Sequence, residues 1–189
     1  MLHELSLFSG YGGFSLGLKL AGIDVRTVGY VEIEPYCQEI IKARIKDGIL
    51  NDAPIYSDIY AFNGNDYRGL VDIITGGFPC PPFSAAGKRL GKADDRNMFP
   101  ETLRVIREIR PSYVLLENVR GLADGPNPYA KEVIGELSTA GYDARWCLRS
   151  AEETGAPHQR YRWWCLANRC DVSNSSESGT GMETHRVNR

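Results

Sequence analysis

The chain has 189 residues, 42% of them hydrophobic and 24% charged, with a formal net charge of −2. This composition is typical of one globular domain with a sizeable core, and such a charge gives little general attraction to phosphate. No run of 18 apolar residues occurs and the N-terminus has no basic region, so neither a membrane span nor a secretory signal is expected.

Apolar runs alternate with amphipathic segments along most of the chain. Buried strands are expected at residues 5–9, 25–33, 71–77, 112–119, 142–150 and 161–168. Helices are expected at residues 14–22, 35–48, 99–109 and 129–141. This alternation predicts a doubly wound α/β fold with a mostly parallel sheet in residues 1–170. The Ser-, Gly- and Thr-rich residues 171–189 are expected to be disordered.

The first strand runs into a glycine-rich turn in the segment LFSGYGGFSLGL. A turn that holds a ligand against the backbone favours residues without Cβ. Ser15 stands where the dinucleotide pattern would have its last glycine, so a pyrophosphate cradle fits poorly. The next strand ends in Glu32, twenty residues beyond Gly12, where a carboxylate can accept both ribose hydroxyls. The two features predict a nucleoside-bearing cofactor, although helix packing alone also explains many glycine turns.

A proline-rich loop, GGFPCPPFSAAG, surrounds Cys80 at the end of the third long apolar run. Each proline fixes φ near −65° and removes a backbone donor, so this segment is a stiff loop that holds its thiol in one direction. The alternative is a buried structural cysteine beside a rigid turn.

The five cysteines of the chain are odd in number, scattered, and form no Cys-x-x-Cys pair. This usage indicates a reducing, cytoplasmic environment rather than disulfides or zinc. The spacing of His158, Cys165 and Cys170 fits no common metal site, so no metal is expected.

Two later segments carry charged groups beside apolar strands. Glu117 ends the apolar run of LLENVRGL, where burial would raise the pKa of its carboxyl and make it a proton donor. The alternatives are a helix N-cap or an ion pair with Arg120. Arg160 and Arg162 alternate in HQRYRWW, either as an exposed strand face or as guanidinium groups that hold a carbonyl or a phosphate.

Basic residues also gather in the loops around these segments, which is a hint of a phosphate-bearing partner. The loop after Cys80 carries Lys88, Arg89, Lys92 and Arg96. The arginines of the expected helix at 99–109 and its end, in contrast, are expected to be solvated; these are Arg104, Arg107 and Arg110.

In this order, the segments LFSGYGGFSLGL, YVEIEPYC, GGFPCPPFSAAG, ENVRGL and HQRYRWW resemble DNA (cytosine-5)-methyltransferases over about residues 4–168. The resemblance implies a Rossmann-like fold that binds S-adenosylmethionine and methylates C5 of a cytosine flipped out of double-stranded DNA. It implies a covalent bond between Cys80 and C6 of the base. It assigns catalysis to Cys80, Glu117, Arg160 and Arg162. It assigns the cofactor pocket to Phe8, Ser9, Gly10, Tyr11, Gly12, Gly13, Glu32, Ile33, Asp58, Ile59, Pro79 and Met98.

The chain departs from the family pattern in three places. Pro81 and His158 each stand where glutamine is the commoner family residue. Family members also continue into a recognition region and a segment that closes the cofactor fold, and both are expected to be missing here. A complementing polypeptide that carries the recognition region is therefore expected, in a bacterial or phage restriction–modification setting. The alternatives are the same chemistry on tRNA, or an inactive remnant that binds S-adenosylmethionine only.

Overall fold

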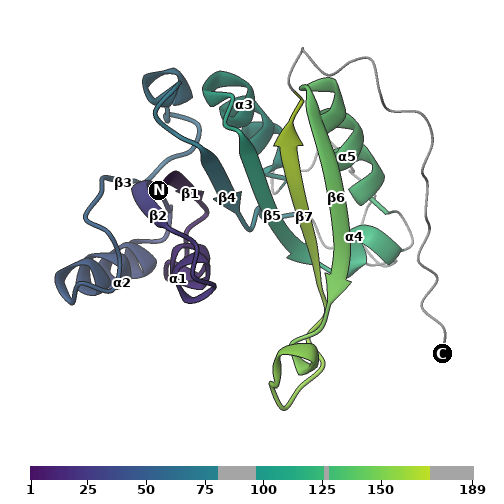
Figure 1. Cartoon of the computed structure of the whole chain (residues 1–189), viewed down its shortest axis with the longest axis horizontal. Coiled ribbons are helices and arrows are strands. Elements are labelled where there is room, and N and C mark those ends of the chain that lie inside the picture. The colour runs from purple at the N-terminus through teal and green to yellow at the C-terminus, as the bar shows by residue number, and fades with distance from the viewer. Residues whose placement is uncertain (81–96, 126–127, 171–189) are drawn as a thin grey trace.

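The computed structural model describes residues 1–80, 97–125 and 128–170. They form one seven-stranded sheet with the order β3-β2-β1-β4-β5-β7-β6 (Figure 1). The strands are β1 Leu2–Leu7, β2 Val25–Val31, β3 Ile55–Tyr56, β4 Ile73–Gly76, β5 Tyr113–Val119, β6 Tyr142–Arg149 and β7 Arg162–Arg169. Strands β1 to β5 pair in parallel, and β7 is antiparallel to both β5 and β6. The predicted α/β fold with a mostly parallel sheet is confirmed.

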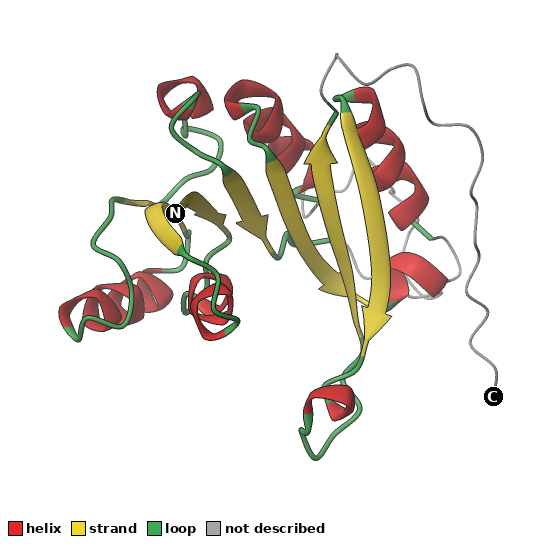
Figure 2. Cartoon of the chain, in the orientation of Figure 1, coloured by secondary structure: helices red, strands yellow, loops and turns green. Residues whose placement is uncertain are grey.

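The helices lie between successive strands, as the alternation of patterns predicts (Figure 2). They are α1 Gly13–Leu20, α2 Pro35–Lys46, α3 Phe99–Ile109, α4 Gly121–Asp124 and α5 Ala130–Thr139, with 3-10 turns η1 Gly64–Tyr67 and η3 Glu152–Thr154. Each helix and strand expected from the sequence is present; the helix at 99–109 has the expected bounds, and the other elements differ by a few residues at one or both ends. The short strand β3 was not expected, because two residues are too few to show an alternating pattern.

The two faces of the sheet are covered by different helices. Leu7 and its β2 neighbour Val31 belong to the main core, which includes buried residues of α3 and α5 such as Ile106 and Leu137. The preceding residue of β2, Tyr30, points to the opposite face and packs against Ile41 of α2. We call the α3–α5 side the inner face and the α1–α2 side the outer face.

The expected tail at residues 171–189, and the loop basic residues Lys88, Arg89, Lys92 and Arg96, lie outside the described residues. Within the described segments, the helices are too short or too polar to cross a lipid bilayer.

Arg104 of α3 differs from the sequence expectation, because it is not a solvated surface cation. Its side chain is 31% exposed and pairs with Glu101 at 2.7 Å and Glu108 at 2.8 Å. The same guanidinium donates to the backbone carbonyls of Ile59 and Phe62, at 2.6 and 3.1 Å. Arg104 therefore ties the segment after β3 to α3.

Replacing Arg104 by methionine should destabilise the protein by about 1.5–3 kcal/mol, because two carbonyls and two carboxylates lose a charged donor. Arg107→Met is the matched control on the same helix. Arg107 forms one exposed pair with Glu136 at 3.1 Å, a contact expected to contribute about 0–1 kcal/mol. Urea unfolding followed by circular dichroism measures both changes, and equal losses would contradict this role of Arg104.

Candidate active site

The carboxyl ends of the parallel strands bring the predicted site residues to one edge of the sheet. Phe8 follows β1, Glu32 follows β2, Cys80 follows β4, and Glu117 lies near the end of β5. Ligands of open α/β sheets bind at this edge. Residues that are far apart in the sequence are thus brought together at this edge.

The turn after β1 has a positive φ at three positions, Phe8, Gly10 and Gly12. Gly12 has φ +80°, and a Cβ there would lie 2.6 Å from Cδ1 of Leu50. Phe8 has φ +50°, a conformation that costs free energy in a residue with a side chain and is typical of functional sites. The side chain of Ser9 donates to the carbonyl of Ser6 at 2.8 Å and holds the start of the turn.

Glu32 is only 7% exposed, and its carboxylate is bound by backbone donors. One oxygen accepts from the amide of Gly10 at 2.6 Å and the other from the amide of Glu34 at 2.9 Å. Glu32 therefore fixes the glycine turn against the end of β2. Each carboxylate oxygen has a second lone pair, so these contacts leave acceptor capacity for a ligand.

Of the remaining cofactor residues predicted from the sequence, Ile33, Asp58, Pro79 and Met98 lie along the same edge, whereas Ile59 is buried in the main core. The carboxylate of Asp58 accepts from the amide of Tyr60 at 2.8 Å, and the Tyr60 hydroxyl lies 3.8 Å from Sδ of Met98. The amide of Met98 donates to the carbonyl of Pro79 at 3.0 Å. Ile33 is 69% exposed, which leaves an apolar surface available to a ligand.

The thiol of Cys80 is hydrogen-bonded to a residue that the sequence analysis did not assign. Its Sγ–H donates to Oδ1 of Asn118 at 2.8 Å. Asn118 is buried, its Oδ1 also accepts from the amide of Val119, and its Nδ2 donates to the carbonyl of Phe78, both at 2.8 Å. These two backbone partners fix the orientation of the amide. An acceptor therefore faces the sulfur, and the hydrogen-bonded species is the protonated thiol.

Electrostatics also favour the neutral form of this cysteine. Burial raises the pKa of the Cys80 thiol above its usual value, and the carboxylate of Glu117 raises it further. The resting site therefore holds a weak nucleophile that needs deprotonation before it can react.

Glu117 forms an ion pair with a residue from another strand. Its Oε1 lies 2.7 Å from Nε of Arg162, which is possible because β5 and β7 pair antiparallel there. A Cβ at Gly77 would lie 3.0 Å from Oε2, so glycine leaves room for the carboxyl. Burial raises the pKa of Glu117, although Arg162 and Arg160 act in the opposite direction.

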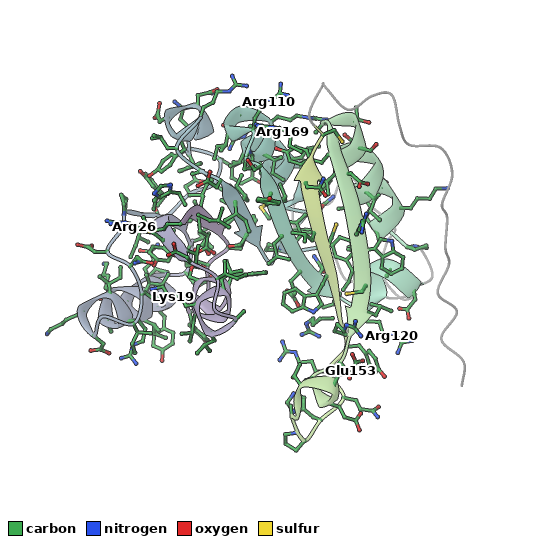
Figure 3. All side chains as sticks on the ribbon, in the orientation of Figure 1. Lys19, Arg26, Arg110, Arg120, Glu153 and Arg169 are labelled. Carbon is green, nitrogen blue, oxygen red and sulfur yellow. The ribbon has the colours of Figure 1, made fainter. Side chains whose placement is uncertain are left out.

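The alternative partner considered for Glu117, Arg120, is engaged elsewhere. Arg120 pairs with Asp124 one turn along α4, and its guanidinium lies 5.0 Å from the centre of the Tyr161 ring. Figure 3 shows Arg120 at the lower end of the sheet, near Glu153 of the turn that joins β6 and β7.

A cavity of about 730 Å³ connects the glycine turn with the charged residues. It is lined by Phe8, Ser9, Gly10, Tyr11, Gly13, Phe14, Gly17, Leu18, Gly77, Leu115, Glu117, Arg160, Arg162 and Trp164. Its size fits a ligand as large as a nucleoside. Cys80 is not among the lining residues, and the described residues contain no group of three side chains arranged to hold a metal ion.

Comparison with known proteins agrees with this arrangement. A family model described as C-5 cytosine-specific DNA methylase matches residues 2–188. The chain belongs to this family. It is 37% identical over 172 residues to the Type II methyltransferase M.NgoMIV of Neisseria gonorrhoeae, a match that covers 90% of this chain and 53% of M.NgoMIV. It is 36% identical to the Type II methyltransferase M.CviJI of Paramecium bursaria Chlorella virus IL3A, covering 89% of this chain and 44% of the relative.

The fold is similar to that of solved methyltransferases. Dnmt2 of S. pombe superposes with a TM-score of 0.69 at 27% identity, covering 89% of this chain and 49% of that one. A Spodoptera frugiperda DNMT2 mutant gives a TM-score of 0.73 at 25% identity, covering 92% and 51%. The chain spans about half the length of the curated relatives it matches.

Asn118 was missed although it stands beside Glu117 in the quoted segment ENVRGL. Because neighbouring strand residues point to opposite faces, Asn118 and Glu117 have different surroundings. The sequence does not show that the side of Asn118 meets the loop after β4. The available signal was an asparagine at the end of an apolar strand, because a side-chain amide that is buried there needs hydrogen-bond partners.

The cysteines of this chain should differ in reactivity when no ligand is bound. At pH 8, iodoacetamide should modify the exposed Cys147 and Cys170 first, then Cys80, and Cys165 last. Cys165 is slowest because burial raises its pKa to about 12, and Cys80 should gain rate as pH rises through its raised pKa. Mass spectrometry of timed samples gives the order, and Cys80 reacting first would contradict the hydrogen-bonded thiol.

Proposed function

We propose that residues 1–170 are a catalytic domain that binds S-adenosylmethionine and transfers a methyl group to C5 of cytosine in double-stranded DNA. One observation carries the proposal. The Cys80 thiol, hydrogen-bonded to Asn118, and the ion pair of Glu117 with Arg162 lie at the same edge of the sheet. The curated relatives at 37% and 36% identity are named Type II methyltransferases, which supports this chemistry and a restriction–modification setting in bacterial or virus-infected cytoplasm.

The described residues fit the methyl donor. The glycine turn has no Cβ to obstruct a ligand at Gly10 or Gly13, and both glycines line the cavity. The spare lone pairs of Glu32 suit ribose hydroxyls, and Ile33 offers an exposed apolar contact for a base. When bound, the donor supplies an electrophilic methyl group.

The chain's own residues supply the activation of cytosine. C5 is a weak nucleophile until a thiolate adds at C6, so Cys80 must lose its proton and form a C6–S bond. An ordinary thiol is only about 3% ionised at pH 7, and the raised pKa of Cys80 lowers this fraction further. Pro79 and Asn118, which flank the thiol, compensate by fixing the direction of approach. After methylation, removal of the C5 proton lets the C6–S bond break and returns the thiolate.

Glu117 has the right environment for a proton donor to N3 of the base. Burial raises its pKa, so its protonated form persists to higher pH than for an exposed carboxyl. Arg162 orients the carboxyl, and Arg160 lies on the same cavity wall, where a guanidinium group can hold the O2 carbonyl. The reaction requires the cytosine to leave the base stack.

We further propose that a complementing polypeptide carries the DNA-recognition region. The net charge of −2 gives this chain little attraction to DNA. The competing proposal is that the same residues transfer the methyl group to a cytosine of tRNA, and a comparison of DNA with tRNA as acceptor distinguishes the two.

Glu32→Ala should weaken binding of S-adenosylmethionine by about 1–3 kcal/mol, because the ribose loses its acceptor and the glycine turn loses its anchor. Glu34→Ala is the control, since Glu34 contacts Glu32 only through its backbone amide. Isothermal titration calorimetry on the folded proteins measures both. No binding to the parent chain, or no difference between the variants, would reject the proposed cofactor site.

With S-adenosylmethionine present, Cys80 should form a denaturant-resistant adduct with a duplex that carries 5-fluorocytosine, because fluorine cannot leave as the C5 proton does. The chain is tested joined to the unmatched part of M.NgoMIV, which is the candidate for the recognition region. Cys80→Ala should abolish the adduct, whereas Cys147→Ala should retain it. An adduct mapped to another cysteine would refute the nucleophile, and an adduct with tRNA but not with DNA would change the acceptor.

A further inference from the structure

A second cavity lies at the edge of the sheet opposite the candidate active site. Its volume is about 260 Å³, and its polar lining consists of Arg68, Asp72, Arg110, Ser112 and Arg169. Asp72 and Ser112 directly precede β4 and β5, and Arg169 is the last residue of β7. Figure 3 shows Arg110 and Arg169 at the upper end of the sheet. This cavity shares no lining residue with the 730 Å³ cavity, so the two are separate.

The three arginines of the second cavity come from three different segments. Arg68 ends the turn η1, Arg110 ends α3, and Arg169 ends β7. Within the described part of the chain, none of them forms an ion pair with a carboxylate. Guanidinium groups around one cavity repel one another unless an anion lies between them. Their arrangement therefore favours an anion from solution as their partner.

The guanidinium group of Arg169 is held in place by the chain itself. Its Nη1 donates to the carbonyl of Arg110 at 2.6 Å, and its backbone amide donates to the carbonyl of Ser112 at 2.9 Å. A guanidinium group has five N–H donors, so four remain for a ligand. Such a planar, fixed group matches the oxygens of a phosphate.

Arg110 has a backbone conformation that favours glycine. Its φ is +56° and its ψ is +54°, in the left-handed region at the end of α3. Among the described residues, Phe8 of the cofactor turn is the only other non-glycine residue with a positive φ. This conformation costs free energy in a residue with a side chain and is typical of functional sites. An arginine at such a position indicates that its guanidinium group has a use.

The surroundings of Tyr142 show that this corner of the protein is electropositive. The Tyr142 hydroxyl donates to the carbonyl of Pro111 at 2.9 Å. Burial raises the pKa of Tyr142 to about 12, while Arg169 and Arg110 both act to lower it. Both guanidinium groups are therefore close enough to stabilise a negative charge at the same place.

Asp72 is the carboxylate in the cavity wall and restricts which anion fits. Its Oδ2 accepts from the amide of His3 at 2.8 Å and lies 3.3 Å from Nδ1 of His3. A carboxylate repels a fully ionised anion, but it accepts a hydrogen bond from an anion that retains a proton. A phosphate monoester has its second pKa at about 6 and can retain one. Sulfate and the phosphodiesters of nucleic acids have no such proton at neutral pH.

We propose that this cavity is a second ligand site, which binds inorganic phosphate or a small phosphate monoester. Arg110 and Arg169 hold the phosphate oxygens, Arg68 adds the third positive charge, and Asp72 accepts the proton of the phosphate. The cavity is below the range of about 300–1,000 Å³ that is typical of drug-sized ligands, so the phosphate carries few further atoms. The inference does not depend on methyl transfer.

The test titrates the full chain with four small anions by isothermal titration calorimetry at pH 7 and constant ionic strength. The probes are inorganic phosphate, ribose 5-phosphate, sulfate and dimethyl phosphate. Inorganic phosphate should bind about tenfold or more tightly than sulfate or dimethyl phosphate, because only it can donate a proton to Asp72. Tighter binding of ribose 5-phosphate identifies a phosphorylated small molecule as the ligand, and weaker binding identifies the free ion. Equal binding of sulfate would overturn the assignment to phosphate.

Four variants locate the binding. Arg110→Gln and Arg68→Gln should each weaken phosphate binding by about tenfold, because each removes a charged donor from the cavity. Arg145→Gln is the matched control, since Arg145 is an exposed arginine of β6 that does not line the cavity. Asp72→Asn should tighten sulfate binding to within a few-fold of phosphate.

Unchanged thermal unfolding in the absence of phosphate shows that the four variants still fold. Phosphate should raise the unfolding temperature of the parent chain and of Arg145→Gln, because a ligand that binds only the folded state stabilises it. No binding of phosphate to the parent chain, or binding that survives both Arg110→Gln and Arg68→Gln, would overturn the proposal.

Discussion

The side-chain amide of Asn118 connects the central strand of the active site to the loop that carries the nucleophile. Its Nδ2 holds the carbonyl of Phe78, and its Oδ1 holds both the thiol of Cys80 and the amide of Val119. All three bonds form at the point where β4 and β5 end, so the position of the sulfur depends on the register of these two strands. In a buried site each of these bonds is costly to lose, because the remaining partner has no water to replace it.

The two carboxylates of the site illustrate how different hydrogen-bond donors give the same chemical group different roles. Glu32 accepts hydrogen bonds from two backbone amides, which make it an anchor for the glycine turn. Glu117 has a single guanidinium partner and an apolar surrounding that raises its pKa, which suits proton donation. The difference lies in the number of donors that each carboxylate meets.

The sequence predicts contacts within a segment better than contacts between segments. The alternation of apolar residues is enough to predict β1, β2, β4, β5, β6 and β7, and the glycine and proline residues indicate the turns that carry the site. The partner of Glu117 could not be predicted, because Arg162 reaches it through an antiparallel pairing of β5 with β7 across 45 residues. The same limit applies to Arg104, whose helical pattern indicates a solvated residue while its carbonyl partners come from the segment after β3. The residues beyond Cys80 in the proline loop and the expected disordered tail stay predictions.

The place of β7 in the sheet has a consequence for synthesis of the chain. Among the described residues, β7 follows β6 in the sequence, yet it lies between β5 and β6. Until residues 162–169 have left the ribosome, one edge of β5 has unpaired backbone donors and acceptors, and Glu117 has no cation beside it. A nascent chain that stops before this point presents a long, apolar strand edge to other chains. This part of the sheet therefore forms only after β7 has been synthesised, and a chain that stops before it is a substrate for chaperones and for aggregation.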